Sequence, residues 1–347
     1  VHLYSNVIGT TIFMVGFYTI NMFFPFAFLN ESADAVGIAV IHSIFNIVAT
    51  MILLPFGKVL VKLACATVRT TKEEKELQTQ VGEFALLDER FLDKPSLAIE
   101  HCRIVTGNMA DLSKKTLFTA LELFEEYDEE KEMLVKQMED TVDNYEDQLG
   151  TYLMKLSGTE LNEKDSETLS VLLHTIGNFE RISDHACNLA EAAKELHDKN
   201  MKFSEKAHTE LHIFTEPLRE IVSNTFEAFH NGDIELAKLV EPLEEVIDDM
   251  NMELKARHVR RLTEGKCTIE LGFVHSDIIT SYERIADHCS NIAVCLIQVK
   301  QEGFDTHEYL GTVKREDNLF FKEHYAEYKK KYELPVTRKF EEPQVTS

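Results

Sequence analysis

The sequence predicts an all-α protein with two N-terminal transmembrane helices followed by two tandem three-helix bundles. Helix breakers are scarce, with 14 Gly and 7 Pro in 347 residues, which favours helices over sheets. Two long uncharged stretches open the chain. The remainder is charged, and its apolar residues recur three and four positions apart, the spacing typical of amphipathic helices.

The two uncharged stretches run from Leu3 to Leu29 and from Ala35 to Gly57. Each is longer than the roughly 20 apolar residues that a helix needs to cross a bilayer, so we expect residues 1–62 to form two transmembrane helices. A buried hairpin in a protein core is the structural alternative. Because Val1 already lies inside an apolar run, we expect the chain to be the C-terminal part of a longer protein.

Charge around these stretches predicts their orientation. The loop between them carries only acidic charges, whereas four basic residues follow the second: Lys58, Lys62, Arg69 and Lys72. An excess of Lys and Arg marks the cytoplasmic side. We therefore expect a cell-membrane protein with residues from about 58 onward in the cytoplasm, beginning with a juxtamembrane connector over residues 63–95.

Each uncharged stretch carries a His and an Asn four residues apart, His2 with Asn6 and His42 with Asn46. Residues at this spacing share one helix face, where they serve either helix-to-helix hydrogen bonding or transport. With Leu54-Pro55-Phe56 behind the second pair, these segments resemble the repeated His-x-x-Phe-Asn elements of sodium/phosphate symporters, with Ser5 replacing Phe in the first copy. The resemblance implies membrane lipid, sodium, inorganic phosphate and a transporter core as partners, but the Gln-Ser-Ser motifs of that family are absent.

The charged part contains one unit twice. Residues 178–190 and 281–293 share Glu-Arg-Ile-x-Asp-His followed by Asn and Ala, and Glu-x-x-x-Asp recurs upstream of both. We therefore expect residues 96–199 and 204–301 to be homologous three-helix repeats, followed by a charged tail over 302–347. The predicted helices are 96–126, 129–156, 166–198, 204–230, 233–264 (interrupted by Pro242), 268–301 and, in the tail, 317–332.

Eight acidic side chains extend apolar rows by one step of four, as in Val135-Glu139-Asp143. Like charges at this spacing repel, and an unpaired charge turned toward a bundle is costly, so we expect a cation with oxygen ligands, Fe, Zn, Mn or Mg. The alternative is a solvated surface with ordinary salt bridges to neighbouring Arg. The candidate ligands are Glu139, Asp143, Glu180, Asp184, Glu244, Asp248, Glu283 and Asp287.

Two further residue types recur beside these acids. His185 and His288 directly follow an Asp and therefore lie about 100° around the helix from it, so we expect them in the core or at an interface. Asn188 and Asn291 lie four residues beyond the same Asp, where they can support the ligands by hydrogen bonds.

The repeated Glu-Arg-Ile-x-Asp-His-x-x-Asn motif, with its upstream Glu-x-x-x-Asp, resembles the PhoU family of phosphate-uptake regulators over about 96–301. The resemblance implies a six-helix protein of two similar bundles, with carboxylate-bridged iron or zinc clusters at the eight acids named above. Together the two resemblances predict the C-terminal segment of a sodium-dependent phosphate symporter, whose cytoplasmic PhoU-like domain regulates transport and is not an enzyme. A homo-oligomer is compatible with this reading.

A net charge of −24 argues against nucleic acid as a partner, because phosphates must be neutralised by Lys and Arg. Two other functions stay open. One is a stand-alone phosphate-signalling regulator or adaptor. The other is a di-metal carboxylate oxidase in a helical bundle, which needs Glu-x-x-His on two facing helices; Glu205-x-x-His208 and Glu227-x-x-His230 are predicted to share one helix.

Overall fold

The structure is a computed structural model that describes residues 2–25, seven positions between 42 and 51 (42, 43, 45, 47, 48, 50 and 51), 84–299 and 319–335. The chain divides into two compact units, Val1–Val81 and Gly82–Ser347. Every regular element in the described ranges is a helix, as the sequence predicts.

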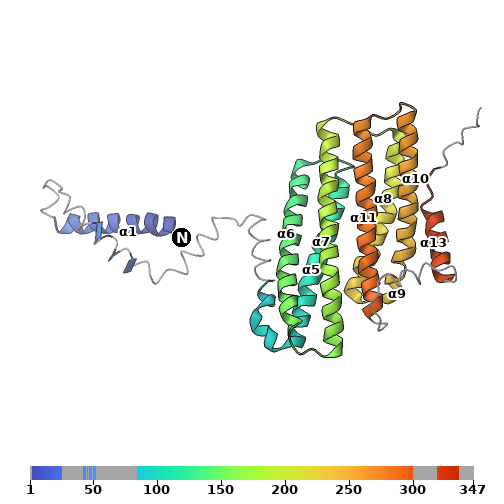
Figure 1. The fold of residues 1–347 in the computed structure, drawn as a ribbon. Coiled ribbons are helices and arrows are strands. Elements are labelled where there is room, and N and C mark those ends of the chain that lie inside the picture. The colour runs from blue at the N-terminus through green and yellow to red at the C-terminus, as the bar shows by residue number, and fades with distance from the viewer. Residues whose placement is uncertain are drawn as a thin grey trace, which may run out of the picture. The chain divides into compact units, whose positions relative to one another are not determined.

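The first unit contains α1, His2–Phe23, drawn in blue in Figure 1. Among the described residues, no helix combines the length and the apolar content that crossing a membrane requires. The predicted cell-membrane location, with residues from about 58 onward in the cytoplasm, is therefore wrong on this finding, and two transmembrane helices are not supported. α1 has 22 residues, seven of which are His, Ser, Thr or Asn: His2, Ser5, Asn6, Thr10, Thr11, Thr19 and Asn21.

The predicted polar pairs of this unit are only partly described. His42 lies with its ring centroid 6.4 Å from that of Phe45. Asn46 and most of the second predicted span, 35–57, lie outside the described residues, as do the side chains of His2 and Asn6.

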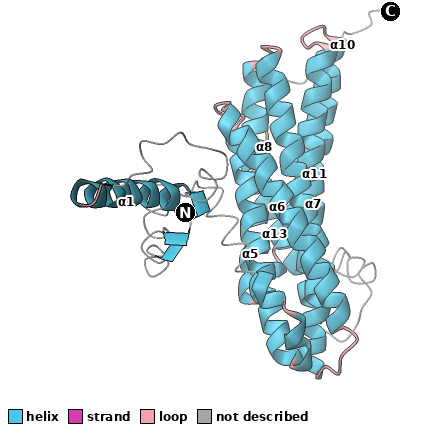
Figure 2. Ribbon diagram, turned by 90° about the vertical axis from the view of Figure 1, so that its left-hand side faces the viewer, coloured by secondary structure: helices cyan, strands magenta, loops and turns pink. Residues whose placement is uncertain are grey.

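The second unit is a bundle of long helices joined by short connections (Figures 1 and 2). The first repeat contributes three helices and the second contributes three long helices and one short one. Their bounds are α5 Pro95–Glu122, α6 Glu129–Leu156, α7 Glu163–Asp198, α8 Glu205–Asn231, α9 Ile234–Ala237, α10 Val240–Thr263 and α11 Ile269–Val299. Before them lie two short 3-10 helices, η3 Ala85–Leu87 and η4 Glu89–Asp93, and after them α13, Leu319–Lys331.

Side-chain caps set the helix starts. The Asp128 carboxylate accepts hydrogen bonds from the backbone N–H groups of Glu130 and Lys131, which satisfies donors that the first turn of α6 leaves free. Ser204 caps α8 in the same way. α8 ends at Gly232, whose φ of +63° is left-handed and suits glycine because it lacks a Cβ.

The predicted helix 233–264 is broken into α9 and α10. Asp233 caps α9, and α10 then starts at Val240 with Pro242 in its first turn. A proline costs least there, because the first turn has no intrahelical acceptor for its missing N–H. The break therefore follows from where Pro242 is tolerated.

The six long helices form two layers. α6, α7, α11 and α10 lie in that order in one layer, and α5 and α8 lie behind them (Figure 1). α7 packs on α5, α6 and α11, and α11 packs on α7, α8 and α10. α7 and α11, which carry the Glu-Arg-Ile-x-Asp-His motifs, therefore join the two repeats and face the acidic helices α6 and α10.

Flanking segments cover the two outer helices of this layer. In the first repeat, Tyr152 on α6 donates a hydrogen bond of 3.1 Å to the Asp88 carbonyl next to η4. In the second, Arg257 on α10 donates one of 2.9 Å to the Pro335 carbonyl after α13. Tyr152 and Arg257 occupy equivalent positions in the two repeats, 105 residues apart. Each repeat therefore contacts its flanking segment from the same position of its acidic helix.

We predict that Phe179→Ala destabilises the bundle by about 3–5 kcal/mol, because a fully buried aromatic ring leaves a cavity when removed. Phe179 on α7 is 0% exposed, and its ring contacts Phe226 and Phe229 of α8 at centroid distances of 5.1 and 4.9 Å. Urea denaturation followed by circular dichroism measures the change. The control Met154→Ala, at a residue 65% exposed, should stay within about 0.5 kcal/mol of the parent; equal losses would contradict the packing.

Candidate functional site

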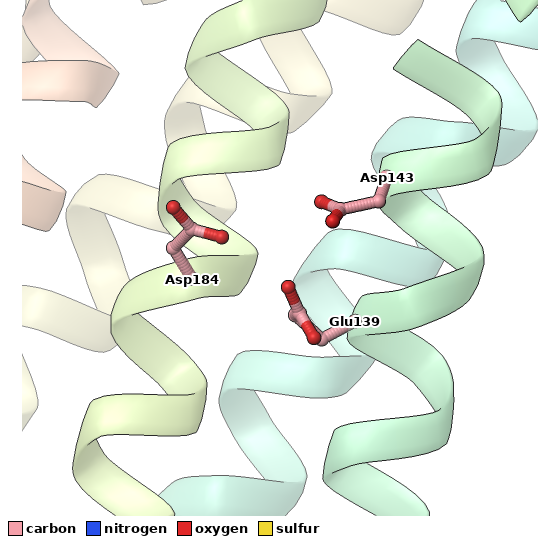
Figure 3. A group of neighbouring side chains, drawn as sticks. All are labelled: Glu139, Asp143 and Asp184. Atoms are coloured by element: carbon pink, nitrogen blue, oxygen red, sulfur yellow. The ribbon is translucent and has the colours of Figure 1, made fainter. Parts of the chain in front are cut away.

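In the first repeat, three of the predicted carboxylates meet between α6 and α7. Glu139 and Asp143 project from α6 toward Asp184 of α7 (Figure 3), and one ligand atom from each lies within 4.8 Å of the others. We call this group cluster 1. The spacing of four places the two α6 acids on one helix face, and the α6–α7 packing brings the α7 acid opposite them.

Two acids of cluster 1, Glu139 and Asp143, resist ionisation. Burial, together with the nearby charges of Asp143 and Asp184, raises the pKa of Glu139 to about 7. Burial and then the charge of Asp184 raise the pKa of Asp143 as well. Three carboxylates this close are therefore unfavourable as a fully charged set, and a bound cation would relieve the repulsion.

The second repeat forms the equivalent group between α10 and α11. Glu244 and Asp248 of α10 and Asp287 of α11 bring one ligand atom each within 4.8 Å of the others. We call this group cluster 2. It is more enclosed than cluster 1, because Glu244 is only 6% exposed whereas Asp143 of cluster 1 is exposed.

The remaining two predicted ligands lie beside the clusters and not within them. Burial and the Asp184 charge raise the pKa of Glu180 to about 7, and its carboxylate lies 3.3 Å from Nε of the exposed Arg181. Glu283 instead accepts a 2.8 Å hydrogen bond from Nδ2 of Asn251. Six of the eight candidate ligands are thus assembled into triads, and these two flank them.

The residues present fit a hard or borderline cation. Each cluster offers three carboxylate oxygens, the donors that Mg²⁺, Mn²⁺, Fe²⁺ and Zn²⁺ accept. Asn251, which donates a hydrogen bond to the flanking Glu283, has a buried Oδ1 with no hydrogen-bond partner within the described residues. A bound cation would supply a Lewis acid that crosslinks two helices.

His185 and His288 occupy the α7–α11 interface. Their ring centroids are 5.8 Å apart, and Nδ1 of His288 lies 3.0 Å from Oδ1 of Asn178. Burial lowers the pKa of His185 and takes that of His288 to about 4. The two rings therefore pack between the clusters, as expected for interface residues.

The two asparagines predicted to support the ligands are both exposed. Nδ2 of Asn188 lies 3.4 Å from Nδ1 of His185. Within the described ranges, neither Asn188 nor Asn291 is shown hydrogen-bonded to a clustered carboxylate. Their predicted role remains a prediction.

The site that the alternative of a di-metal oxidase requires is not assembled within the described bundle. Both Glu-x-x-His motifs lie on α8, and His230 pairs with Asp111 at 2.8 Å, so no facing pair of such motifs forms in the described bundle. A cavity of about 890 Å³ lies where the end of α7 meets the start of α8. Apolar residues such as Phe124, Met201 and Phe203 line it, and none of the clustered carboxylates does.

Sequence reasoning missed two polar residues that extend the acidic rows. Glu146 follows Asp143 by three positions and Asn251 follows Asp248 by three, so both lie on the ligand face of their helix. Burial, with the charges of Asp147 and Asp143, raises the pKa of Glu146. The sequence contains a signal for these two residues. Glu146 and Asn251 are 105 residues apart, which is also the distance between the Glu-x-x-x-Asp motifs of α6 and α10.

We predict that Glu139→Gln stabilises the cation-free protein at alkaline pH and leaves its stability unchanged near pH 5. A carboxyl group whose pKa rises on folding weakens the fold as pH increases from its unfolded value toward and through about 7, and Gln does not titrate. Urea midpoints at pH 5 and pH 8 in the presence of a chelator measure the difference. Parallel pH profiles for the two proteins would contradict the raised pKa, and Glu167→Gln, an exposed acid of α7, serves as the control.

Comparison with known proteins supports this organisation. The profile of one protein family, described as the PhoU domain, matches residues 106–193 and 215–296. A relative from Thermotoga maritima, named phosphate-specific transport system accessory protein PhoU homolog 1, is 29% identical over 151 residues, covering 44% of this chain and 64% of the relative. The putative inorganic phosphate export protein YjbB of Escherichia coli is 22% identical over 273 residues, covering 77% of this chain and 49% of that protein.

The chain therefore spans 64% and 49% of the length of these two relatives. Among solved structures, the phosphate transport system regulatory protein PhoU from Streptococcus pneumoniae superposes with a TM-score of 0.55 at 18% identity, covering 61% of this chain and 99% of that one. PhoU from Pseudomonas aeruginosa gives the same TM-score and coverage at 19% identity. The fold is thus the PhoU fold, and the two three-helix repeats of this chain belong to the PhoU domain family.

Proposed function

We propose that this chain is a regulatory or accessory component of inorganic phosphate transport whose helical bundle responds to bound divalent cations. Two observations support the proposal. Both repeats match the PhoU domain, and relatives over this region are named for phosphate transport or export. The paired carboxylate clusters, one in each repeat, carry the cation-dependent part of the proposal.

Each cluster lies between two helices that pack against each other. Cluster 1 joins α6 to α7, and cluster 2 joins α10 to α11. Without a cation, the acids of cluster 1 repel one another and the helices separate more easily. With one bound, the same carboxylates hold the helices together, so the spacing of the outer helices depends on cation occupancy.

The donor chemistry suits iron or zinc, with manganese or magnesium as further candidates. Carboxylate-held cations keep coordination positions open for water or another oxygen ligand, and inorganic phosphate is an oxygen ligand of this kind. In this proposal the bundle therefore binds a cation and responds by a change in the spacing of its outer helices, and it does not catalyse a reaction. The partner that binds the bundle and responds to its conformation is, in this proposal, a phosphate-transport protein.

The narrower hypothesis of a sodium/phosphate symporter segment has one supporting observation here. The relative named as a phosphate export protein aligns with 77% of this chain, more than the two repeats alone. The predicted membrane location was corrected above. What remains as a second candidate is that the bundle acts on a phosphate carrier.

We predict that Asp143→Asn combined with Asp184→Asn removes one of the two cation sites. These substitutions keep size and hydrogen bonding but delete two of the three charges of cluster 1, which lowers affinity for hard cations. Isothermal titration with Mn²⁺, together with elemental analysis of the purified protein, measures the loss.

A matched control replaces one exposed acid on each of the same helices, Glu130→Gln with Glu167→Gln. It should bind cations like the parent. If the parent binds no divalent cation, or if the control loses binding as fully as the cluster variant, the proposed site is wrong.

We further predict that cells expressing the parent chain show an altered rate of radiolabelled phosphate uptake relative to cells carrying an empty vector. The Asp143→Asn/Asp184→Asn variant should lose most of that effect, because it removes the cation-dependent coupling of α6 to α7. Equal uptake in all three strains, with expression verified by immunoblot, argues against a role in phosphate transport.

A further inference from the structure

The cavity of about 890 Å³ lies where the two repeats meet. The first repeat lines it with the ends of α5 and α7 and with the connection between α5 and α6, and the second repeat lines it with α8 and α11. A volume of this size is typical of small-molecule sites, which occur preferentially where domains meet. None of the clustered carboxylates lines the cavity, so it is separate from the two acidic clusters.

Much of the cavity wall is apolar and comes from both repeats. Two of its side chains are buried and four are partly exposed, so a ligand in the cavity removes further apolar surface from water, which favours binding. These six side chains are Leu121, Phe124, Met201, Phe203, Leu211 and Ile278.

One half-buried cation faces this apolar wall. Arg219 of α8 lines the cavity, and its Cζ lies 5.3 Å from the centre of the Phe118 ring. Its charge also reaches Tyr282 in the cavity wall: burial raises the pKa of Tyr282 to about 12, while the hydrogen bond with Thr215 and the charge of Arg219 lower it. The part of the chain that the structure describes offers Arg219 no carboxylate at ion-pair distance.

The acids around this arginine do not neutralise it. Glu220, its neighbour on α8, is paired with Lys331 of α13 at 2.6 Å. Glu125, Glu205 and Glu216 line the cavity, but all three are exposed and therefore hydrated. The guanidinium thus keeps hydrogen-bond donors for an anion, whereas the three exposed acids repel a ligand that carries several negative charges.

We propose that this cavity binds an amphipathic organic anion with a single negative charge, whose apolar body covers the six apolar side chains and whose carboxylate pairs with Arg219. A fatty acid of medium chain length has this chemistry. Apolar contact supplies affinity, and the charge-assisted hydrogen bond selects the anion. The site goes beyond the proposed function and does not depend on cation binding, because it shares no residue with either acidic cluster.

A fluorescence experiment on the full chain tests the site. The chain contains no Trp, so a single introduced Trp reports only on its own surroundings. Phe124→Trp places an indole in the cavity wall, at a side chain that is already aromatic and half-buried. Its emission is followed during titration with dodecanoate that carries a terminal bromine, which quenches Trp on contact, below the concentration at which micelles form. Met154→Trp, at a residue 65% exposed on α6 and outside the cavity wall, is the matched control.

The Phe124→Trp protein should show saturable quenching, and the Met154→Trp protein should not. Adding Arg219→Gln to Phe124→Trp should weaken binding by about tenfold, the effect of losing one hydrogen bond to a charged group. Arg219→Lys keeps the charge and should recover part of the affinity. Arg260→Gln, at an exposed arginine of α10 outside the cavity wall, should bind like Phe124→Trp alone.

The terminally brominated dodecanol, which has the same apolar body without the charge, should bind more weakly than the carboxylate and should not respond to Arg219→Gln. Thermal melting followed by circular dichroism checks that each variant is folded. If Arg219→Gln unfolds the bundle, the comparison of carboxylate with alcohol in the Phe124→Trp protein decides the question alone.

Three outcomes overturn the inference. Absent or unsaturable quenching in Phe124→Trp, or equal quenching in Met154→Trp, shows that no site exists at the cavity. Equal affinity for the carboxylate and the alcohol shows that the cavity does not select an anion. Unchanged carboxylate binding in a folded Arg219→Gln variant shows that this arginine does not hold the charge. None of these results bears on Mn²⁺ binding at the acidic clusters, so the proposed function is tested separately.

Discussion

The bundle is organised around acidic side chains that face each other across a helix–helix gap. Glu139 and Asp143 meet Asp184 between α6 and α7, and Glu244 and Asp248 meet Asp287 between α10 and α11. Such groups cannot all ionise at low cost in a partly buried setting, which is why the pKa of Glu139 is raised. The fold therefore holds a repulsive arrangement in place, and hydrophobic packing elsewhere supplies the stability that permits it.

The position of this arrangement makes it suitable for regulation. α7 and α11 form the shared centre of the bundle, with His185 and His288 packed between them. The acidic helices α6 and α10 lie on the two outer sides (Figure 1), where flanking segments also attach through Tyr152 and Arg257. In the proposed function, a change in cation occupancy would therefore act at the outer helices and would leave the central contact between the repeats intact.

Much of the second unit could be predicted from the sequence, because repetition and the 3.6-residue period report local geometry. The helix 129–156 agrees with α6 at both ends, and the paired Glu-x-x-x-Asp motifs identified the acids that cluster. Tertiary detail could not be predicted in this way. Glu283 on α11 differs from Glu180 on α7 because Asn251 and Lys255 of α10 lie beside it. Such contacts between helices cannot be read from the sequence. The prediction of a membrane location is overturned by the finding that no helix among the described residues is long and apolar enough to cross a membrane.

The central claim is that each acidic cluster binds a cation. The most direct measurement is anomalous diffraction from crystals of the full chain grown with Mn²⁺. The account predicts an anomalous peak between α6 and α7 and another between α10 and α11, each within about 2.0–2.6 Å of carboxylate oxygens. Well-ordered clusters without a peak, with their carboxylates turned to water or to neighbouring Lys and Arg, would contradict it.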